Sequence, residues 1–187
     1  MEKDNLFQCP ICQNSEYRIM GKPFIPNEME KFIRKKYRIV RCNQCRGYSV
    51  NPAIDFTKEE WSQIYNISYF SNPSEKFIVQ RKKETKEKLN RLAAAVDSKN
   101  IRYLDIGCGE GFSLIDAFER SWECFAVDIT DHRIENAKND KINFIKGTLF
   151  NANYPSDYFD IVYLDSVLEH VTNPKEYLNE IYRIMKK

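Results

Sequence analysis

From residue 101 onward the sequence alternates short apolar runs with segments of helical periodicity, and this alternation limits the fold more than any other feature. The helical pattern predicts helices at 112–120, 131–139 and 174–185, and the apolar runs predict strands at 101–106, 124–128, 142–145 and 159–164. Strands that alternate with helices of this length form right-handed βαβ units with parallel strands. The predicted fold class is α/β, with a Rossmann-like doubly wound parallel sheet of about four strands.

Three glycines stand at alternate positions in the turn between the first predicted strand and its helix. Gly107, Gly109 and Gly111 give the spacing G-x-G-x-G, whereas a dinucleotide-binding loop would have its third glycine where this chain has Phe112. In doubly wound sheets this turn lies at the carboxyl edge, where backbone without a Cβ can approach a ligand closely. Asp128 ends the second predicted strand, where a carboxylate can hydrogen-bond both ribose hydroxyls of an adenosine ligand.

Four segments of the chain, in this order, resemble the sequence motifs of class I S-adenosylmethionine-dependent methyltransferases. They are residues 104–111, 125–128, 144–149 and 158–171. The last segment contains Leu168-Glu-His-Val171, a turn typical of one branch of this family. The resemblance covers residues 101–187 and implies S-adenosylmethionine as the cofactor.

The resemblance implies a role for the glycine loop and for the acid that precedes it. The loop of Gly107, Cys108, Gly109 and Gly111 would surround the methionine part of the cofactor. Asp105 would reach the amino group of the cofactor, directly or through a water molecule. The Cys108 side chain itself is interpreted as a packing residue.

The later motifs would hold the rest of the cofactor. By the same resemblance, Asp128 would bind the ribose and Ile129 would pack on the adenine face. Thr148 and the Leu149 amide would face the adenine edge, and Asp165 would close the site at the end of the fourth strand.

The turn after the fourth predicted strand bears on the methyl acceptor. Enzymes that methylate exocyclic amino groups carry an Asn/Asp-Pro-Pro-Tyr/Phe turn here, whereas this chain has Asp165-Ser-Val-Leu168, which favours an oxygen or carbon acceptor. Glu169 and His170 follow and are the predicted catalytic residues, since a His side chain has a pKa suited to proton removal near neutral pH. For His170 a purely structural role in the turn stays open beside catalysis.

Four of the six cysteines form two C-x-x-C pairs near the N-terminus. Cys9 and Cys12 are separated by 29 residues from Cys42 and Cys45. Four thiolates in tetrahedral array favour Zn²⁺, and because they leave no coordination position open, such an ion would be structural. The alternatives are a redox dithiol or two unrelated reduced pairs. The long separation predicts an inserted hairpin.

Changes in amino-acid composition along the sequence predict that the chain has three parts. These are a zinc-ribbon-like β module at 1–50, an aromatic-rich linker at 51–74, and the methyltransferase domain from 75 to 187. In the linker, Tyr65, Tyr69 and Phe70 could form a lid over the cofactor or dock the linker onto the domain. Residues 75–96 predict an amphipathic helix, and its basic face is interpreted as solvated rather than as a nucleic-acid patch; that face comprises Arg81, Lys82, Lys83, Lys86 and Lys88.

The order of a zinc module and methyltransferase motifs resembles a group of zinc-ribbon methyltransferases, many of which act on sugars, polysaccharides or small metabolites. The predicted acceptor is therefore a small molecule or saccharide. An RNA methyltransferase that grips RNA with the ribbon and a non-catalytic cofactor-binding protein are the alternatives. Nucleic acid is disfavoured because 29 Lys and Arg nearly balance 27 Asp and Glu, giving a net charge of +2, and because the basic residues of the ribbon alternate with acids.

The two ends of the sequence lead to two further expectations, one on the compartment and one on the length of the protein. The N-terminus lacks a signal pattern and no apolar run approaches the ~20 residues that span a bilayer, which predicts a cytoplasmic protein without a membrane partner. The family's sheet has further strands after the fourth, whereas this sequence stops after the helix that follows it. We therefore expect the chain to be a fragment of a longer protein whose remaining strands are needed for turnover. The oligomeric state is not predicted.

Overall fold

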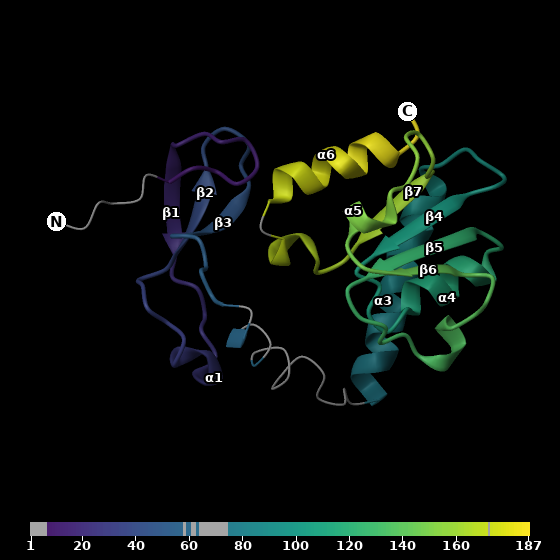
Figure 1. Ribbon diagram of the computed structural model, residues 1–187, viewed down its shortest axis with the longest axis horizontal. Helices are drawn as coiled ribbons and strands as arrows, with labels where there is room; N and C mark the ends of the chain where they lie inside the picture. The colour runs from purple at the N-terminus through teal and green to yellow at the C-terminus, as the bar shows by residue number, and fades with distance from the viewer. Residues whose placement is uncertain (1–6, 58, 61–62, 64–74, 172) are drawn as a thin grey trace. The chain divides into compact units, whose positions relative to one another are not determined.

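The computed structural model describes residues 7–57, 59–60, 63, 75–171 and 173–187 (Figure 1). The chain divides into two compact units, Met1–Pro73 and Ser74–Lys187. The aromatic linker residues Tyr65, Tyr69 and Phe70 lie outside the described residues. No helix in the described part of the chain is long and apolar enough to cross a bilayer.

The first unit is built on an antiparallel sheet with the strand order β1-β2-β3. Strand β1 spans Tyr17–Gly21, β2 spans Arg38–Cys42 and β3 spans Tyr48–Asn51, and the short helix α1 (Asn27–Glu30) lies between β1 and β2. Because β1 and β2 pair antiparallel, the sequence between the two cysteine pairs contains the hairpin that was predicted.

The second unit contains a sheet of four parallel strands in the order β6-β5-β4-β7 (Figure 1). Strand β4 spans Arg102–Ile106, β5 spans Glu123–Asp128, β6 spans Asn143–Lys146 and β7 spans Ile161–Leu164. The predicted parallel α/β sheet is confirmed, with strands close to the predicted ranges.

Two helices cover one face of this sheet. They are α3 (Glu75–Ala94) and α4 (Phe112–Glu119). Leu89 of α3 and Leu114 of α4 are fully buried and share one hydrophobic cluster with Tyr103 of β4. The burial of Leu89 fixes the long helix α3 on the sheet.

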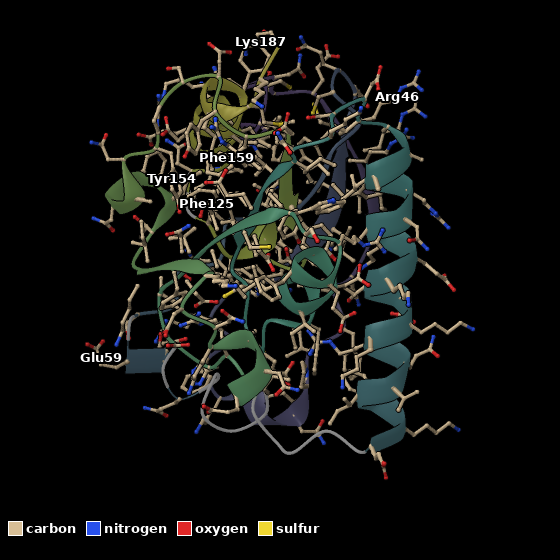
Figure 2. The ribbon with its side chains drawn as sticks, turned by 90° about the vertical axis from the view of Figure 1, so that its right-hand side faces the viewer. Arg46, Glu59, Phe125, Tyr154, Phe159 and Lys187 are labelled. Carbon is tan, nitrogen blue, oxygen red and sulfur yellow. The ribbon has the colours of Figure 1, made fainter. Side chains whose placement is uncertain are left out.

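Two further helices cover the opposite face, so the sheet is doubly wound as predicted. They are α5 (Leu149–Ala152) and α6 (Pro174–Ile184). Beneath them the rings of Phe125, Tyr154 and Phe159 meet edge to face, with centroids 4.8 to 6.1 Å apart (Figure 2). Such contacts add to the stability that burial of the rings provides.

The helix predicted at 131–139 is wrong, because only the 3₁₀ helix η2 (Glu135–Ala137) forms there. The side chain of Asp131 accepts a hydrogen bond from the amide two residues further on, which competes with a helical hydrogen bond. The amide of Ile134 donates to the carbonyl of Glu110 at 3.0 Å. This segment is held against the glycine loop instead of forming a regular helix.

The attachment of α3 through Leu89 can be tested by truncating the side chain. We expect Leu89→Ala to lower the free energy of unfolding by about 3 kcal/mol, because it leaves a cavity in a fully buried cluster. Leu92→Ala on the same helix is the matched control and should cost less, since Leu92 is only partly buried. Urea unfolding followed by circular dichroism measures both, and equal losses would contradict the anchoring role of Leu89.

Candidate functional site

The glycine loop follows β4 and has a left-handed backbone at all three glycines. The φ angles of Gly107, Gly109 and Gly111 are 70°, 51° and 81°. A Cβ at Gly107 would lie 2.4 Å from Val167 Cγ2, and one at Gly111 would lie 2.6 Å from Ala137 Cβ. A Cβ at Gly109 would meet nothing within 4 Å. The outer glycines are therefore required by packing, while Gly109 presents bare backbone to open space.

Asp128 links the glycine loop to the end of β5. Its Oδ2 accepts a hydrogen bond from the Gly109 amide at 3.0 Å, and its Oδ1 accepts one from the Thr130 amide at 3.0 Å. The Thr130 hydroxyl also donates to Oδ1, at 3.3 Å, whereas Oδ2 has a second lone pair and can still accept a hydrogen bond from a ligand. Asp128 thus both orders the loop and remains able to bind hydroxyl groups.

Asp105 lies inside strand β4, and its side chain is buried at the carboxyl edge of the sheet. It is 3% exposed, and the Ser113 hydroxyl donates a hydrogen bond to its Oδ2. Burial, together with the charges of Asp128 and Asp165, raises the pKa of the Asp105 carboxyl to about 7 although the Ser113 hydrogen bond lowers it. A cationic group bound beside it would favour the charged form.

Asp165 follows β7 at the same edge of the sheet. Its Oδ2 accepts hydrogen bonds from Lys88 Nζ at 2.6 Å and from the Tyr163 hydroxyl at 3.0 Å. Burial raises the pKa of Asp165, but the bonds from Lys88 and Tyr163 outweigh it, so the pKa is lowered overall. Lys88, Tyr163 and Ser113 were not predicted as site residues, because their role depends on contacts between side chains that the local sequence does not indicate.

The predicted adenine contacts lie after β5 and β6. Ile129 is 70% exposed and available for packing against a ligand. Thr148 caps α5, where its hydroxyl accepts a hydrogen bond from the Asn151 amide at 3.4 Å and donates one to Asn151 Oδ1 at 2.7 Å. Leu149 is buried. The structure thus gives Thr148 a partner within the protein.

The two predicted catalytic residues belong to the 3₁₀ helix η3 (Leu168–His170), which follows the loop after β7. Glu169 and His170 are both exposed, and the His170 amide donates to the Val167 carbonyl at 2.9 Å. Glu169 and His170 come four and five residues after Asp165, in the segment that follows β7.

Cys108 is placed differently from its neighbours in the loop. Its side chain is buried in the cluster that contains Leu89 and Leu114, and burial raises the pKa of its thiol well above the usual value. Only the backbone of Cys108 can therefore face a ligand.

The four predicted metal-ligating cysteines come together in the first unit. The Sγ atoms of Cys9, Cys12, Cys42 and Cys45 all lie within 4.8 Å of one another, with Cys9–Cys45 and Cys12–Cys42 at 3.5 Å. A tetrahedral ion with Zn–S bonds of about 2.3 Å would separate its sulfurs by about 3.8 Å. The geometry of the cluster fits such an ion.

The acidity of two of these thiols differs. Burial raises the pKa of Cys42, but the amides of Cys45 and Gln44 outweigh it and bring the value to about 7. The Gly47 amide lowers the pKa of Cys45, but burial and the neighbouring thiols raise it to about 12. Thiols this close resist joint ionisation, and a bound cation would remove that resistance and release their protons.

Comparison with known sequences supports a methyltransferase domain in the second unit. A family model described as a methyltransferase domain matches residues 104–187. A mitochondrial ubiquinone biosynthesis O-methyltransferase of Dictyostelium discoideum is 26% identical over 71% of this chain and 49% of its own length. A sterol 24-C-methyltransferase of Neurospora crassa is 25% identical over 73% of this chain and 37% of its own length. The chain thus spans about half or less of the length of these curated relatives.

A solved structure agrees with this fold. A proposed S-adenosyl-L-methionine-dependent methyltransferase from Methanococcus maripaludis superposes with a TM-score of 0.50, covering 72% of this chain and 63% of that chain. At 21% sequence identity this likeness concerns the fold alone.

The burial of Asp105 predicts a pH dependence of stability. Its carboxyl titrates near 3.8 when unfolded and at about 7 when folded, so between these values the folded state holds a proton that the unfolded state has lost. The free energy of unfolding should therefore fall as the pH rises, by up to about 2 kcal/mol between pH 5 and pH 7 relative to Asp105→Asn. Urea unfolding of both proteins across this range measures the difference, and parallel pH profiles would contradict a raised pKa.

Proposed function

We propose that this chain, whose residues 104–187 belong to the class I S-adenosylmethionine-dependent methyltransferases, contributes to methyl transfer onto an oxygen or carbon atom of a small metabolite or saccharide. The observation that carries the proposal is the pairing of open backbone at Gly109 with the carboxylates of Asp105 and Asp128. These groups suit a ligand that carries a positive charge and ribose hydroxyls.

The residues present fit S-adenosylmethionine, which supplies a methyl group on a sulfonium when it is bound. Asp105 is a buried carboxyl without a cationic partner among the described residues, and it would bind the amino group. Asp128 would accept hydrogen bonds from the ribose hydroxyls, and the exposed side chain of Ile129 would cover the adenine. The amide edge of the glycine loop would lie against the methionine part.

The proposed acceptor atom follows from the turn after β7. The turn residues Asp165-Ser-Val-Leu168 lack the Pro-Pro pair of enzymes that methylate exocyclic amino groups. A carbon acceptor needs mainly positioning, because methyl transfer is an in-line displacement. An oxygen acceptor that must lose its proton needs a base, and the exposed side chains of Glu169 and His170 are the candidates. The relatives named above include both an O- and a C-methyltransferase, which supports these two atom types.

The first unit is proposed to hold a structural Zn²⁺ ion through its four clustered cysteines. The buried residues of this unit's cluster are Phe7, Cys9, Val40 and Cys42, so two of the four are themselves metal ligands. A core this small contributes little stability without a further constraint. Bound zinc would supply that constraint.

The cofactor site can be tested at Gly109. We expect Gly109→Ala to weaken binding of S-adenosylhomocysteine at least ~10-fold, because the new Cβ would project into the open space beside the loop and alter its left-handed backbone. Asn153→Ala is the matched control, since Asn153 also has a left-handed backbone, with φ 48°, at the end of α5. Calorimetric titration measures both. Unchanged binding by Gly109→Ala, or equal weakening by the control, would contradict this site.

The zinc proposal predicts a metal content of about one ion per chain. Cys42→Ser should lose the ion and destabilise the first unit, because it removes a buried ligand. Cys124→Ser, a buried cysteine of the second unit, should keep the full metal content. Elemental analysis of the purified proteins reads both, and a metal-free wild-type chain with four reduced thiols would overturn the assignment.

A further inference from the structure

Helix α3 brings two cationic side chains to the loops that form the proposed cofactor site. Arg81 Nη1 lies 2.9 Å from Oε2 of Glu110 in the glycine loop, and Lys88 Nζ lies 2.6 Å from Oδ2 of Asp165 after β7. Residues seven positions apart lie on the same side of a helix. The neighbouring Leu89 is fully buried, so the position of Lys88 is fixed by the packing of α3 on the sheet.

Three carboxylates share the carboxyl edge of the sheet, and they are neutralised in different ways. Asp128 accepts hydrogen bonds from two backbone amides and from the Thr130 hydroxyl, and Asp105 accepts one from the Ser113 hydroxyl. Of these three, Asp165 alone has an ion pair within the part of the chain that the structure describes, and its partner is Lys88. The ammonium of Lys88 therefore offsets part of the negative charge that this edge presents to a ligand.

We propose that Lys88 sets the charge preference of the cofactor site, an inference that rests on the proposed function. S-adenosylmethionine and its product S-adenosylhomocysteine differ by one methyl group and by the positive charge on sulfur. Three carboxylates favour the charged form, and the ammonium of Lys88 offsets part of their field. Lys88 thereby weakens binding of S-adenosylmethionine relative to binding of S-adenosylhomocysteine. It also limits how strongly the site stabilises the sulfonium charge, which is lost as the methyl group leaves.

A purely structural role fits Lys88 less well than an electrostatic one. The side chains of Lys88 and Asp165 are 45% and 46% exposed, and ion pairs with that much exposure contribute little to folding. Helix α3 is held instead by Leu89 and its cluster. Replacing the ammonium should consequently leave the fold intact while changing the charge of the site.

The experiment compares ligands that differ in charge. Calorimetric titration with S-adenosylmethionine, sinefungin and S-adenosylhomocysteine gives three dissociation constants, and sinefungin carries an amine-bearing carbon in place of the sulfonium. In Lys88→Met we expect binding of both cationic ligands to strengthen about fivefold relative to the neutral product. Lys88→Arg should keep the wild-type ratios because it keeps the charge. Lys83→Met, on an exposed lysine of the same helix without an ion pair among the described residues, is the matched control.

Each outcome decides between distinct conclusions. Unchanged ratios in Lys88→Met, with normal binding by the wild-type chain, would overturn the inference and leave the proposed function standing. An equal loss of affinity for all three ligands would show a structural role for Lys88 and overturn it as well. If the folded wild-type chain binds none of the ligands, the proposed function fails and this inference fails with it. An electrostatic effect should also shrink as the salt concentration rises.

Discussion

The burial of strand β4 on both faces is the constraint from which the rest of the second unit follows. Its residues Tyr103 to Ile106 are all nearly inaccessible. Tyr103 belongs to the hydrophobic cluster under α3 and α4, whereas Leu104 and Ile106 belong to the cluster under α5 and α6. A strand enclosed in this way can meet solvent only at its ends. The chain turns sharply at Gly107, and the polar groups of the site collect at the edge where β4 stops.

The alternation of apolar runs and helical segments was enough to predict the parallel sheet, because a strand buried on both faces has to be apolar almost throughout. Prediction of helices from the local sequence pattern failed where side chains compete with the backbone for hydrogen bonds. The helix predicted at 131–139 would begin at Asp131, whereas the Asp131 carboxylate accepts a hydrogen bond from the amide two residues later. Thr148 and Asn151 form a reciprocal cap for the short helix α5, which has too few residues to show a periodicity.

The residues of the candidate site likewise fall into two groups, those that the sequence indicates and those that only the folded structure brings together. The glycines and Asp128 stand at spacings that the fold itself dictates, so the sequence pattern could indicate them, whereas the role of Asp105 was implied by the family resemblance. Lys88 and Ser113 belong to helices, and nothing in their local sequence indicates a carboxylate partner. Lys88 is 77 residues from Asp165, and only the packing of α3 on the sheet brings the two together. Contacts of this kind depend on the assembled fold.

The hydrogen bond from the Gly109 amide to Asp128 has a kinetic consequence. It joins the turns after two neighbouring strands, so the glycine loop loses its conformational entropy when the chain folds. A ligand that enters this edge meets ordered backbone and need not supply the free energy for arranging it. Its association rate should then depend on diffusion and orientation, and differences in affinity among related ligands should arise mainly from how fast each one leaves.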